Sequence, residues 1–140
     1  MKRNASAVWN GGLKDGRGTL STDSGVLANT PYNFSMRFEN EKGTNPEELI
    51  GAAHAGCFSM ALSAILGETG MTARSIRTRA TVTLEKQDAG FTITAVHLDV
   101  TAEIPGADPQ KFLEAANKAK AGCPVSRALK ADISMDARLG

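Results

Sequence analysis

The chain has 140 residues, of which 41% are hydrophobic and 22% are charged, and its formal net charge is +1. This length suffices for one hydrophobic core, so we expect a single domain over residues 1–140. The Lys and Arg residues are scattered, which argues against a nucleic-acid-binding surface. No apolar stretch follows the basic N-terminus, and the longest apolar run, Cys57–Leu66, falls short of about 20 residues. We therefore expect a cytoplasmic protein without a secretory signal or a membrane span.

The N-terminal third predicts antiparallel strands separated by turns. Residues Ala5–Asn10 alternate around Trp9, and glycine-containing turns follow this segment. Residues Asn33–Glu39 alternate as well. We expect a strand there, with Arg37 on the face opposite the aromatic side chains.

The strongest helix signal in the chain begins at Asn45-Pro46. Asparagine is a good N-cap, and proline suits the first helical position because no intrahelical N–H bond is lost there. The two glutamates that follow favour the positive end of the helix dipole. We expect this helix to run to about Leu66 and to end at Gly67 or Gly70, which places Cys57 near its middle.

A second antiparallel sheet segment follows the long helix. Alternation over residues 76–84 predicts one strand, and alternation over Phe91–Ile104 predicts its partner. Asp88-Ala89-Gly90 between them is typical of a hairpin turn. The alternation changes phase at Ala95-Val96, which predicts a β-bulge.

The C-terminal part predicts two helices and a final strand. Asp108 suits the N-cap of a helix from Pro109 to about Ala121, a short helix begins at Pro124, and residues 133–137 alternate. The resulting order is βββ-α-ββ-α-α-β. This order predicts an α+β fold with a long central helix and C-terminal helices.

The chain has two cysteines, Cys57 and Cys123, far apart and without a Cys-x-x-Cys motif. Such a pair can be two packed thiols, a structural disulfide, or an attacking thiol with its resolving partner. A reducing compartment disfavours a lasting disulfide. Cys123 precedes Pro124 at the start of a helix, where N–H groups and the dipole favour a thiolate. From the residues alone, the packed and the reactive interpretations both remain open.

His54 stands three residues before Cys57 on the same helix face and raises two other hypotheses. A zinc site needs further ligands with paired spacing, which the chain lacks, so we expect no metal. His54 could instead activate Cys57 as in cysteine hydrolases, although the base usually comes from another element. The hydrolase is kept as a minor alternative.

Two long motifs resemble the OsmC/Ohr family, the osmotically inducible protein C and organic hydroperoxide resistance proteins. One runs from Arg37-Phe-Glu through Gly43-Thr-Asn-Pro-Glu-Glu-Leu-Ile-Gly-Ala-Ala-His-Ala-Gly-Cys57-Phe-Ser-Met-Ala, and the other is Lys118-Ala-Lys-Ala-Gly-Cys-Pro-Val-Ser126. The resemblance extends over nearly the whole chain and is closer to the OsmC branch. It implies an intertwined homodimer with active sites at the interface.

The resemblance implies a thiol-dependent peroxidase that reduces organic hydroperoxides, and more weakly hydrogen peroxide, in oxidative and osmotic stress defence. Cys57 would attack the peroxide and become a sulfenic acid, which Cys123 would resolve as a disulfide. A lipoyl-type dithiol or a lipoylated protein would reduce that disulfide, without a bound cofactor. A second possibility is a non-catalytic, stress-induced protein of this fold that binds a small ligand.

The resemblance also implies that Glu47 and Arg37 belong to the site. The arginine would stabilise the thiolate, and the glutamate would orient the guanidinium. The Ohr branch places its arginine in an early Gly-Gly-Arg-Asp-Gly turn, where this chain has a lysine. Lys14 and Arg17 therefore remain alternatives to Arg37. The candidates to line an apolar substrate pocket are Phe34, Phe38, Phe58 and Met60.

Glu47 and Cys57 lie ten residues apart on one predicted helix, which separates their Cα atoms by about 15 Å. An arginine does not easily bridge that distance within one straight segment. Either the helix bends near Gly51 or Gly56, or the charged pair comes from the other subunit. We expect the second arrangement, in which Arg37 and Glu47 complete the site around Cys57 of the partner chain.

Overall fold

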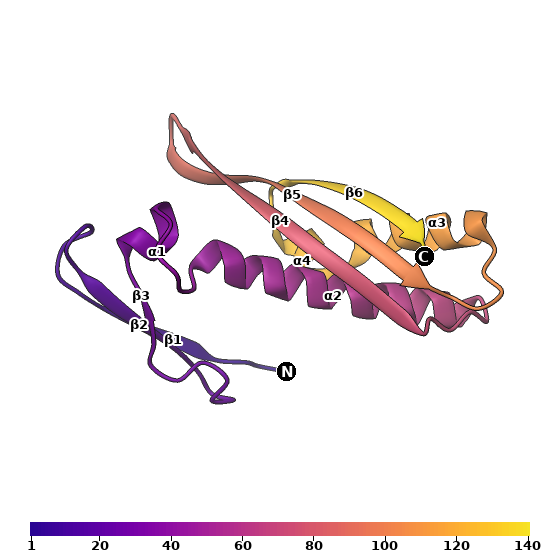
Figure 1. Cartoon of the computed structure of the whole chain (residues 1–140), viewed down its shortest axis with the longest axis horizontal. Helices are drawn as coiled ribbons and strands as arrows, with labels where there is room; N and C mark the ends of the chain where they lie inside the picture. Colours follow the sequence, from indigo (N-terminus) through magenta and orange to yellow (C-terminus); the bar gives the residue numbers. More distant parts are fainter. The chain divides into compact units, whose positions relative to one another are not determined.

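The computed structural model describes all residues 1–140 and divides the chain into two compact units, Met1–Leu49 and Ile50–Gly140 (Figure 1). Its elements are mixed helices and strands, which confirms the predicted α+β class. Each unit has its own three-stranded sheet.

The first unit contains a sheet of order β1-β2-β3, in which both pairings are antiparallel. Strand β1 spans Ala5–Asn10, β2 spans Arg17–Thr22 and β3 spans Thr30–Tyr32. Gly18 lies between the Trp9 and Tyr32 side chains, whose ring centroids are 5.3 Å apart. A Cβ atom at Gly18 would lie 2.6 Å from the Trp9 ring, so only glycine allows these aromatic side chains to pack across β2.

The strand predicted over Asn33–Glu39 is wrong, because this segment forms helix α1, Phe34–Phe38. Asn33 caps the helix, with its Oδ1 accepting a hydrogen bond from the Met36 N–H at 2.8 Å. In a helix, Phe34 and Phe38 are neighbours one turn apart, and their ring centroids are 4.9 Å apart. The Arg37 guanidinium lies 5.1 Å from the Phe38 ring centroid, so it is not opposite the aromatic side chains.

Helix α2, Pro46–Glu68, begins and ends through local signals in the sequence. Asn45 Oδ1 accepts a hydrogen bond from the Glu48 N–H at 2.8 Å, as expected of an N-cap. At the other end, Gly70 has φ +77°, and the Met71 and Gly70 N–H groups donate to Leu66 and Gly67 carbonyls. This pattern is a Schellman motif, in which glycine supplies the left-handed residue.

Helix α2 is longer and more uniformly apolar than the run Cys57–Leu66 indicated. It has 23 residues, and an 18-residue stretch within it has a mean hydropathy of 1.7, which meets the length and composition of a membrane-crossing helix. Core helices of soluble proteins meet the same criterion, and Phe58, Leu62 and Leu66 on α2 are buried in a hydrophobic core. One face of α2 therefore packs in the hydrophobic core.

The second unit contains a sheet of order β4-β5-β6. Strands β4, Ser75–Gln87, and β5, Gly90–Glu103, form the predicted antiparallel hairpin, and β6, Asp132–Leu139, adds in parallel to β5. The register shifts between Thr83 and Leu84, opposite Ala95 and Ile93. The predicted bulge therefore exists, beside the position where the alternation changes phase.

Helices α3, Pro109–Gly122, and α4, Pro124–Ala128, complete the second unit. Asp108 caps α3 by accepting hydrogen bonds from the Gln110 and Lys111 N–H groups. The core forms where alternate side chains of β5 meet the apolar faces of α2 and α3. Its fully buried members include Phe58, Leu62, Val96, Leu98, Val100, Phe112, Ala116 and Ala119.

Candidate active site

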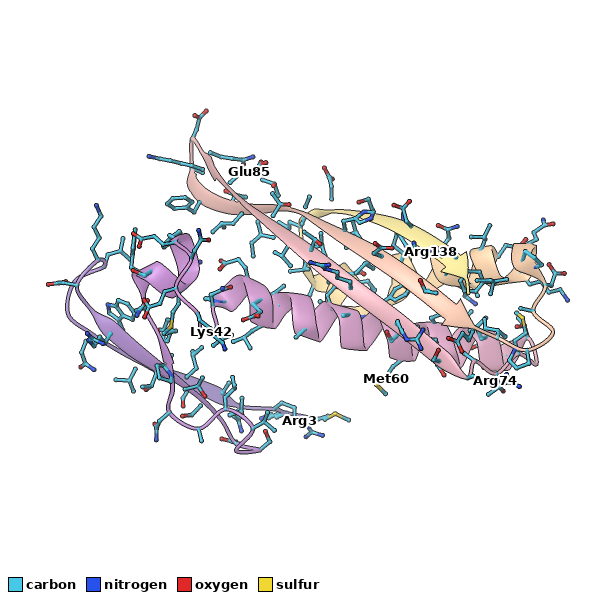
Figure 2. The ribbon with its side chains drawn as sticks, in the orientation of Figure 1. Arg3, Lys42, Met60, Arg74, Glu85 and Arg138 are labelled. Atoms are coloured by element: carbon cyan, nitrogen blue, oxygen red, sulfur yellow. The ribbon has the colours of Figure 1, made fainter.

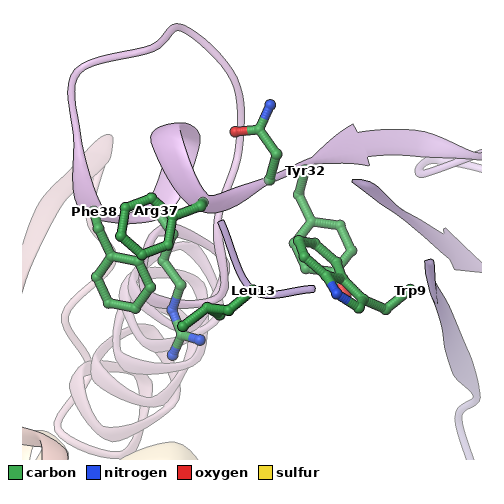
Figure 3. Close-up of a pocket in the computed structure, with 7 residues that line it drawn as sticks. Trp9, Leu13, Tyr32, Arg37 and Phe38 are labelled. Atoms are coloured by element: carbon green, nitrogen blue, oxygen red, sulfur yellow. The ribbon is translucent and has the colours of Figure 1, made fainter. Parts of the chain in front are cut away.

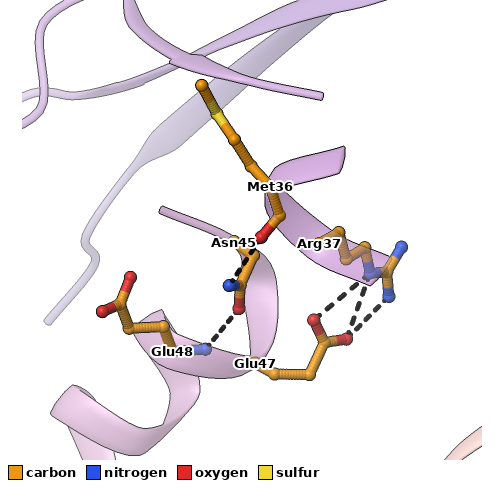
Figure 4. Close-up of polar contacts among 5 residues, drawn as sticks. All are labelled: Met36, Arg37, Asn45, Glu47 and Glu48. Atoms are coloured by element: carbon orange, nitrogen blue, oxygen red, sulfur yellow. Dashed lines mark hydrogen bonds and ion pairs between the residues drawn. The ribbon is translucent and has the colours of Figure 1, made fainter. Parts of the chain in front are cut away.

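The chain brings the four sequence-predicted site residues together as two pairs, one in each compact unit. Arg37 on α1 and Glu47 in the first turn of α2 form the charged pair of the first unit (Figure 4). Arg37 Nε lies 3.2 Å from both carboxylate oxygens of Glu47, and Nη2 lies 2.7 Å from Oε1. One edge of the guanidinium is thus fixed by the carboxylate.

The position of the Arg37 side chain is set by the turn that joins α1 to α2. Asn45 bonds in both directions there, since its Nδ2 donates to the Met36 carbonyl at 3.1 Å while its Oδ1 caps α2. Glu47 is buried, with 9% of the residue exposed, whereas the Arg37 side chain is 36% exposed. The buried partner anchors the guanidinium, and Nη1 makes no hydrogen bond within the chain.

A largely apolar cavity of about 250 Å³ lies beside Arg37 (Figure 3). It is lined by Trp9, Leu13, Tyr32, Asn33, Phe34, Arg37 and Phe38. Of the four predicted pocket residues, Phe34 and Phe38 belong to this wall. Phe58 lies instead in the core of the second unit, and Met60 on α2 is 77% exposed (Figure 2). Lys14 Nζ lies 6.0 Å from the Phe34 ring centroid.

The two cysteines form the other pair, in the second unit. Both are free thiols; Cys57 is half-buried on α2, and Cys123 is buried where α3 ends and α4 begins. Cys123 is the N-cap of α4, and its Sγ accepts a hydrogen bond from the Ser126 N–H at 3.4 Å. The chain therefore supplies the resolving candidate with a fixed backbone donor.

The groups around Cys57 raise the pKa of its thiol. Burial raises this pKa most, the Val125 backbone N–H lowers it, and Cys123 raises it through its side chain and through repulsion between the two thiolates. The Cys57 thiol therefore lies near both Cys123 and the Val125 backbone. No cation contributes to this balance, so the groups around Cys57 do not by themselves stabilise its thiolate.

Cys123 is linked through Ser126 to His54, a contact that the sequence did not predict. Ser126 Oγ is 3.1 Å from Cys123 Sγ and 2.7 Å from His54 Nε2, and all three side chains are buried. Burial lowers the pKa of His54, and its Nδ1 has no hydrogen-bond partner. The sequence marked Ser126 only as the end of the second family motif and as the third residue after a helix N-cap. His54 thus bonds to Ser126, and no hydrogen bond joins its ring to Cys57, which disfavours the cysteine hydrolase.

Comparisons with known proteins identify the family of this chain. A model of the OsmC-like protein family matches residues 39–138. The chain is 58% identical over 139 residues to peroxiredoxin OsmC of Escherichia coli K12, which covers 99% of this chain and 97% of that protein. It is 29% identical over 123 residues to the organic hydroperoxide resistance protein OhrB of Bacillus subtilis, which covers 87% of this chain and 88% of that protein.

Solved structures show the same fold. The crystal structure of OhrB of Bacillus subtilis has a TM-score of 0.72 at 28% identity, over 98% of each chain. An OsmC-like protein from Mycoplasma pneumoniae has a TM-score of 0.76 at 16% identity, a likeness of fold alone, over 99% of this chain and 97% of that chain. The chain therefore belongs to the OsmC-like family, and it is closer to OsmC than to the organic hydroperoxide resistance proteins.

Proposed function

We propose that the protein is a thiol-dependent peroxidase that reduces organic hydroperoxides, and more weakly hydrogen peroxide, to alcohols or water. The observation that carries this proposal is the proximity of two free thiols, Cys57 and Cys123, in the second unit. A ligand-binding protein has no need of such a pair, whereas a two-cysteine peroxidase requires it. The name of the relative from Escherichia coli, peroxiredoxin OsmC, supports the same activity.

The reaction divides between the two thiols. The Cys57 thiolate attacks the terminal oxygen of the hydroperoxide, the O–O bond breaks, and the alkoxide takes a proton and leaves as the alcohol. Cys57 is then a sulfenic acid, which Cys123 converts into a disulfide with loss of water. A dithiol restores both thiols by exchange. Family resemblance points to a lipoyl-type dithiol or a lipoylated protein as the reductant, with no bound cofactor.

The first step requires a cation, and none is among the groups that shift the pKa of Cys57. A nearby guanidinium would lower the thiol pKa and donate to the peroxide oxygens as their bond breaks. Arg37 suits this role because Glu47 fixes one edge of its guanidinium while Nη1 is free of hydrogen bonds in the chain. Since Glu47 and Cys57 stand about 15 Å apart along a straight helix, we assign Arg37 and Glu47 to Cys57 of the partner subunit.

The first unit supports a homodimer on independent grounds. None of its apolar side chains is buried, and every residue of β1 is exposed, including Val8 and Trp9. A unit of this size without a buried core needs further apolar cover to be stable. A second copy of the chain would provide that cover, and the two units would then act as one domain of an intertwined dimer.

The apolar cavity beside Arg37 favours organic over inorganic peroxides. Phe34, Phe38 and Leu13 would receive the organic group while the guanidinium faces the oxygens. The remaining expectations, a cytoplasmic location and a role in oxidative and osmotic stress, follow from the sequence and the family.

One experiment tests the peroxidase against the ligand-binding protein. Reduced protein is treated with one equivalent of cumene hydroperoxide, and free thiols and intact mass are followed. A Cys57–Cys123 disulfide that is absent in the Cys57→Ser variant is the expected result. Thiols that stay reduced would contradict the peroxidase and leave the ligand-binding protein as the better description.

A further inference from the structure

The second unit contains a continuous line of contacts that starts at the reacting thiols and ends at a buried imidazole. Cys57 lies near Cys123, Cys123 Sγ lies 3.1 Å from Ser126 Oγ, and Ser126 Oγ lies 2.7 Å from His54 Nε2. The residues come from α2, from the α3–α4 junction and from α4, so the line depends on tertiary packing. The two-thiol chemistry proposed above uses the first two residues only.

We propose that Ser126 and His54 form a proton relay that activates Cys123 for the resolving step. This inference rests on the proposed peroxidase function. Ser126 contacts the reacting sulfur directly, and His54 acts through Ser126 as a positioning residue and proton acceptor.

The resolving step is where such a relay is needed. Cys123 attacks the sulfur of the Cys57 sulfenic acid most effectively as a thiolate, and an ordinary cysteine with a pKa of about 8.5 is mostly protonated at neutral pH. Cys123 is buried and has no cation among its hydrogen-bond partners. Water has little access to its proton, so an internal acceptor would raise the rate.

The proton balance of the step is complete within these residues. The Cys123 thiol gives its proton to Ser126 Oγ as Ser126 gives its own to His54 Nε2, and a sulfur–sulfur bond forms with Cys57. The sulfur–oxygen bond of the sulfenic acid breaks, and hydroxide leaves. The proton held by His54 returns through Ser126 to that hydroxide, so the products are one disulfide and one water.

The state of His54 suits a transient acceptor. Desolvation lowers the pKa of the imidazole, which keeps Nε2 free to accept in neutral solution and favours return of the proton afterwards. The titratable groups in this line are the thiols of Cys123 and Cys57, and no charged side chain forms a hydrogen bond or ion pair with His54.

A purely structural role explains the histidine less well. Nδ1 of His54 is buried without a partner, and an unpaired buried polar atom is unfavourable. If the only task of this position were to hydrogen bond to Ser126, a residue without a second, unpaired ring nitrogen would serve better. The imidazole is therefore retained in spite of its unpaired nitrogen, as expected when the other nitrogen has a chemical task.

The test separates the two chemical steps in single-turnover experiments with cumene hydroperoxide. Stopped-flow fluorescence follows oxidation of Cys57, and quenched samples with dimedone and mass spectrometry follow conversion of the sulfenic acid into the disulfide. The variants are His54→Gln, whose amide can still hydrogen bond to Ser126 but is not basic, and Ser126→Ala. Ser59→Ala is the matched control, since it removes another part-buried hydrogen bond of α2, the 2.8 Å contact with Thr78, which involves neither thiol.

We expect disulfide formation to slow by about a hundredfold or more in His54→Gln and Ser126→Ala, with oxidation of Cys57 nearly unchanged. In His54→Gln the rate of disulfide formation should rise steadily between pH 7 and about pH 9, as hydroxide replaces the lost acceptor, whereas the native rate should be level there. Ser126→Thr, which keeps the hydroxyl, should recover most of the rate. Ser59→Ala should form the disulfide at the native rate.

Several outcomes would overturn the relay. Native disulfide formation in His54→Gln would show that a hydrogen bond to Ser126 suffices, and native rates in Ser126→Ala would show that neither residue takes part. If one variant fails to fold, the other decides by the same criteria. Failure of the native protein to oxidise Cys57 would overturn the proposed peroxidase itself, a result that is distinct because it appears in the first step.

Discussion

Glu47 fixes Arg37 by one edge: Nε lies 3.2 Å from both carboxylate oxygens and Nη2 lies 2.7 Å from Oε1. The carboxylate is buried and the guanidinium extends to a cavity, so the pair is an oriented donor and not a surface salt bridge. A guanidinium can bond to a carboxylate along one edge and to a second anion along the other, which an ammonium group cannot do.

Arg37→Lys should therefore slow the oxidation of Cys57 by about a hundredfold or more while the protein stays folded. Lysine keeps the positive charge but lacks the planar set of donors that can bond to Glu47 and to the peroxide at the same time. Stopped-flow oxidation with cumene hydroperoxide measures this rate. Arg17→Lys is the matched control and should react at the native rate. The reverse result, a slow Arg17 variant and a normal Arg37 variant, would move the role to Arg17.

If Arg37 of one subunit serves Cys57 of the other, two inactive variants should complement each other in a mixed dimer. Homodimers of Arg37→Ala and of Cys57→Ser should each be nearly inactive. In a mixed dimer, one site combines the intact Cys57 of the first variant with the intact Arg37 of the second. After statistical mixing, about a quarter of the native activity should therefore return.

Subunits are mixed by joint refolding or coexpression, and activity is measured per total protein. An arrangement with all catalytic residues in one subunit would give no recovery. Each variant mixed with itself provides the baseline.

The resolving role of Cys123 gives a third prediction. In Cys123→Ala, Cys57 should be oxidised at close to the native rate in the first turnover, because Cys123 does not attack the peroxide. Without a partner thiol, Cys57 should then accumulate as sulfenic acid and, with excess peroxide, as sulfinic and sulfonic acids. Intact mass and dimedone labelling detect these forms. Continued turnover of the variant at the native rate would contradict the assignment.

The sequence predicted most of the helices and strands because their signals are local. Asn45 and Asp108 cap helices in the structure as the pattern indicated, and Gly70 ends α2. Strands β2 and β3 were not given bounds, and α1, a five-residue helix, was mistaken for a strand. Alternation over so few residues also fits a helix with Phe34 and Phe38 one turn apart. The deciding signal was the cap at Asn33, directly after β3.

The site was less accessible from the sequence, since its contacts are made by tertiary packing. The two cysteines were singled out by their local context and assigned roles by family resemblance, and only the packing of α2 against the α3–α4 junction brings them together. The bond between His54 and Ser126 joins residues 72 positions apart. No periodicity or spacing rule connects such residues, so the relay candidate appears only in the structure.

The buried histidine gives a fourth prediction, on stability. Burial lowers the pKa of His54 in the folded protein, so the unfolded chain binds a proton to this residue at a higher pH than the folded chain does. The stability that the neutral imidazole contributes is complete above the unfolded pKa of about 6.5 and is lost as the pH falls through the lower folded pKa. Urea denaturation at pH 7.5 and pH 5.0 should show the loss.

The chain has two histidines, which provides a matched control. His54→Gln should lower stability at pH 7.5 but lose much less on acidification than the native protein, because the group that takes up the proton on unfolding is gone. His97→Gln removes the other histidine, which contacts Ser134 and Asp136 on strand β6, and shows how much of the change comes from the loss of a histidine as such. An unchanged acid dependence in His54→Gln would mean that other groups, such as the carboxylates, control stability in this pH range.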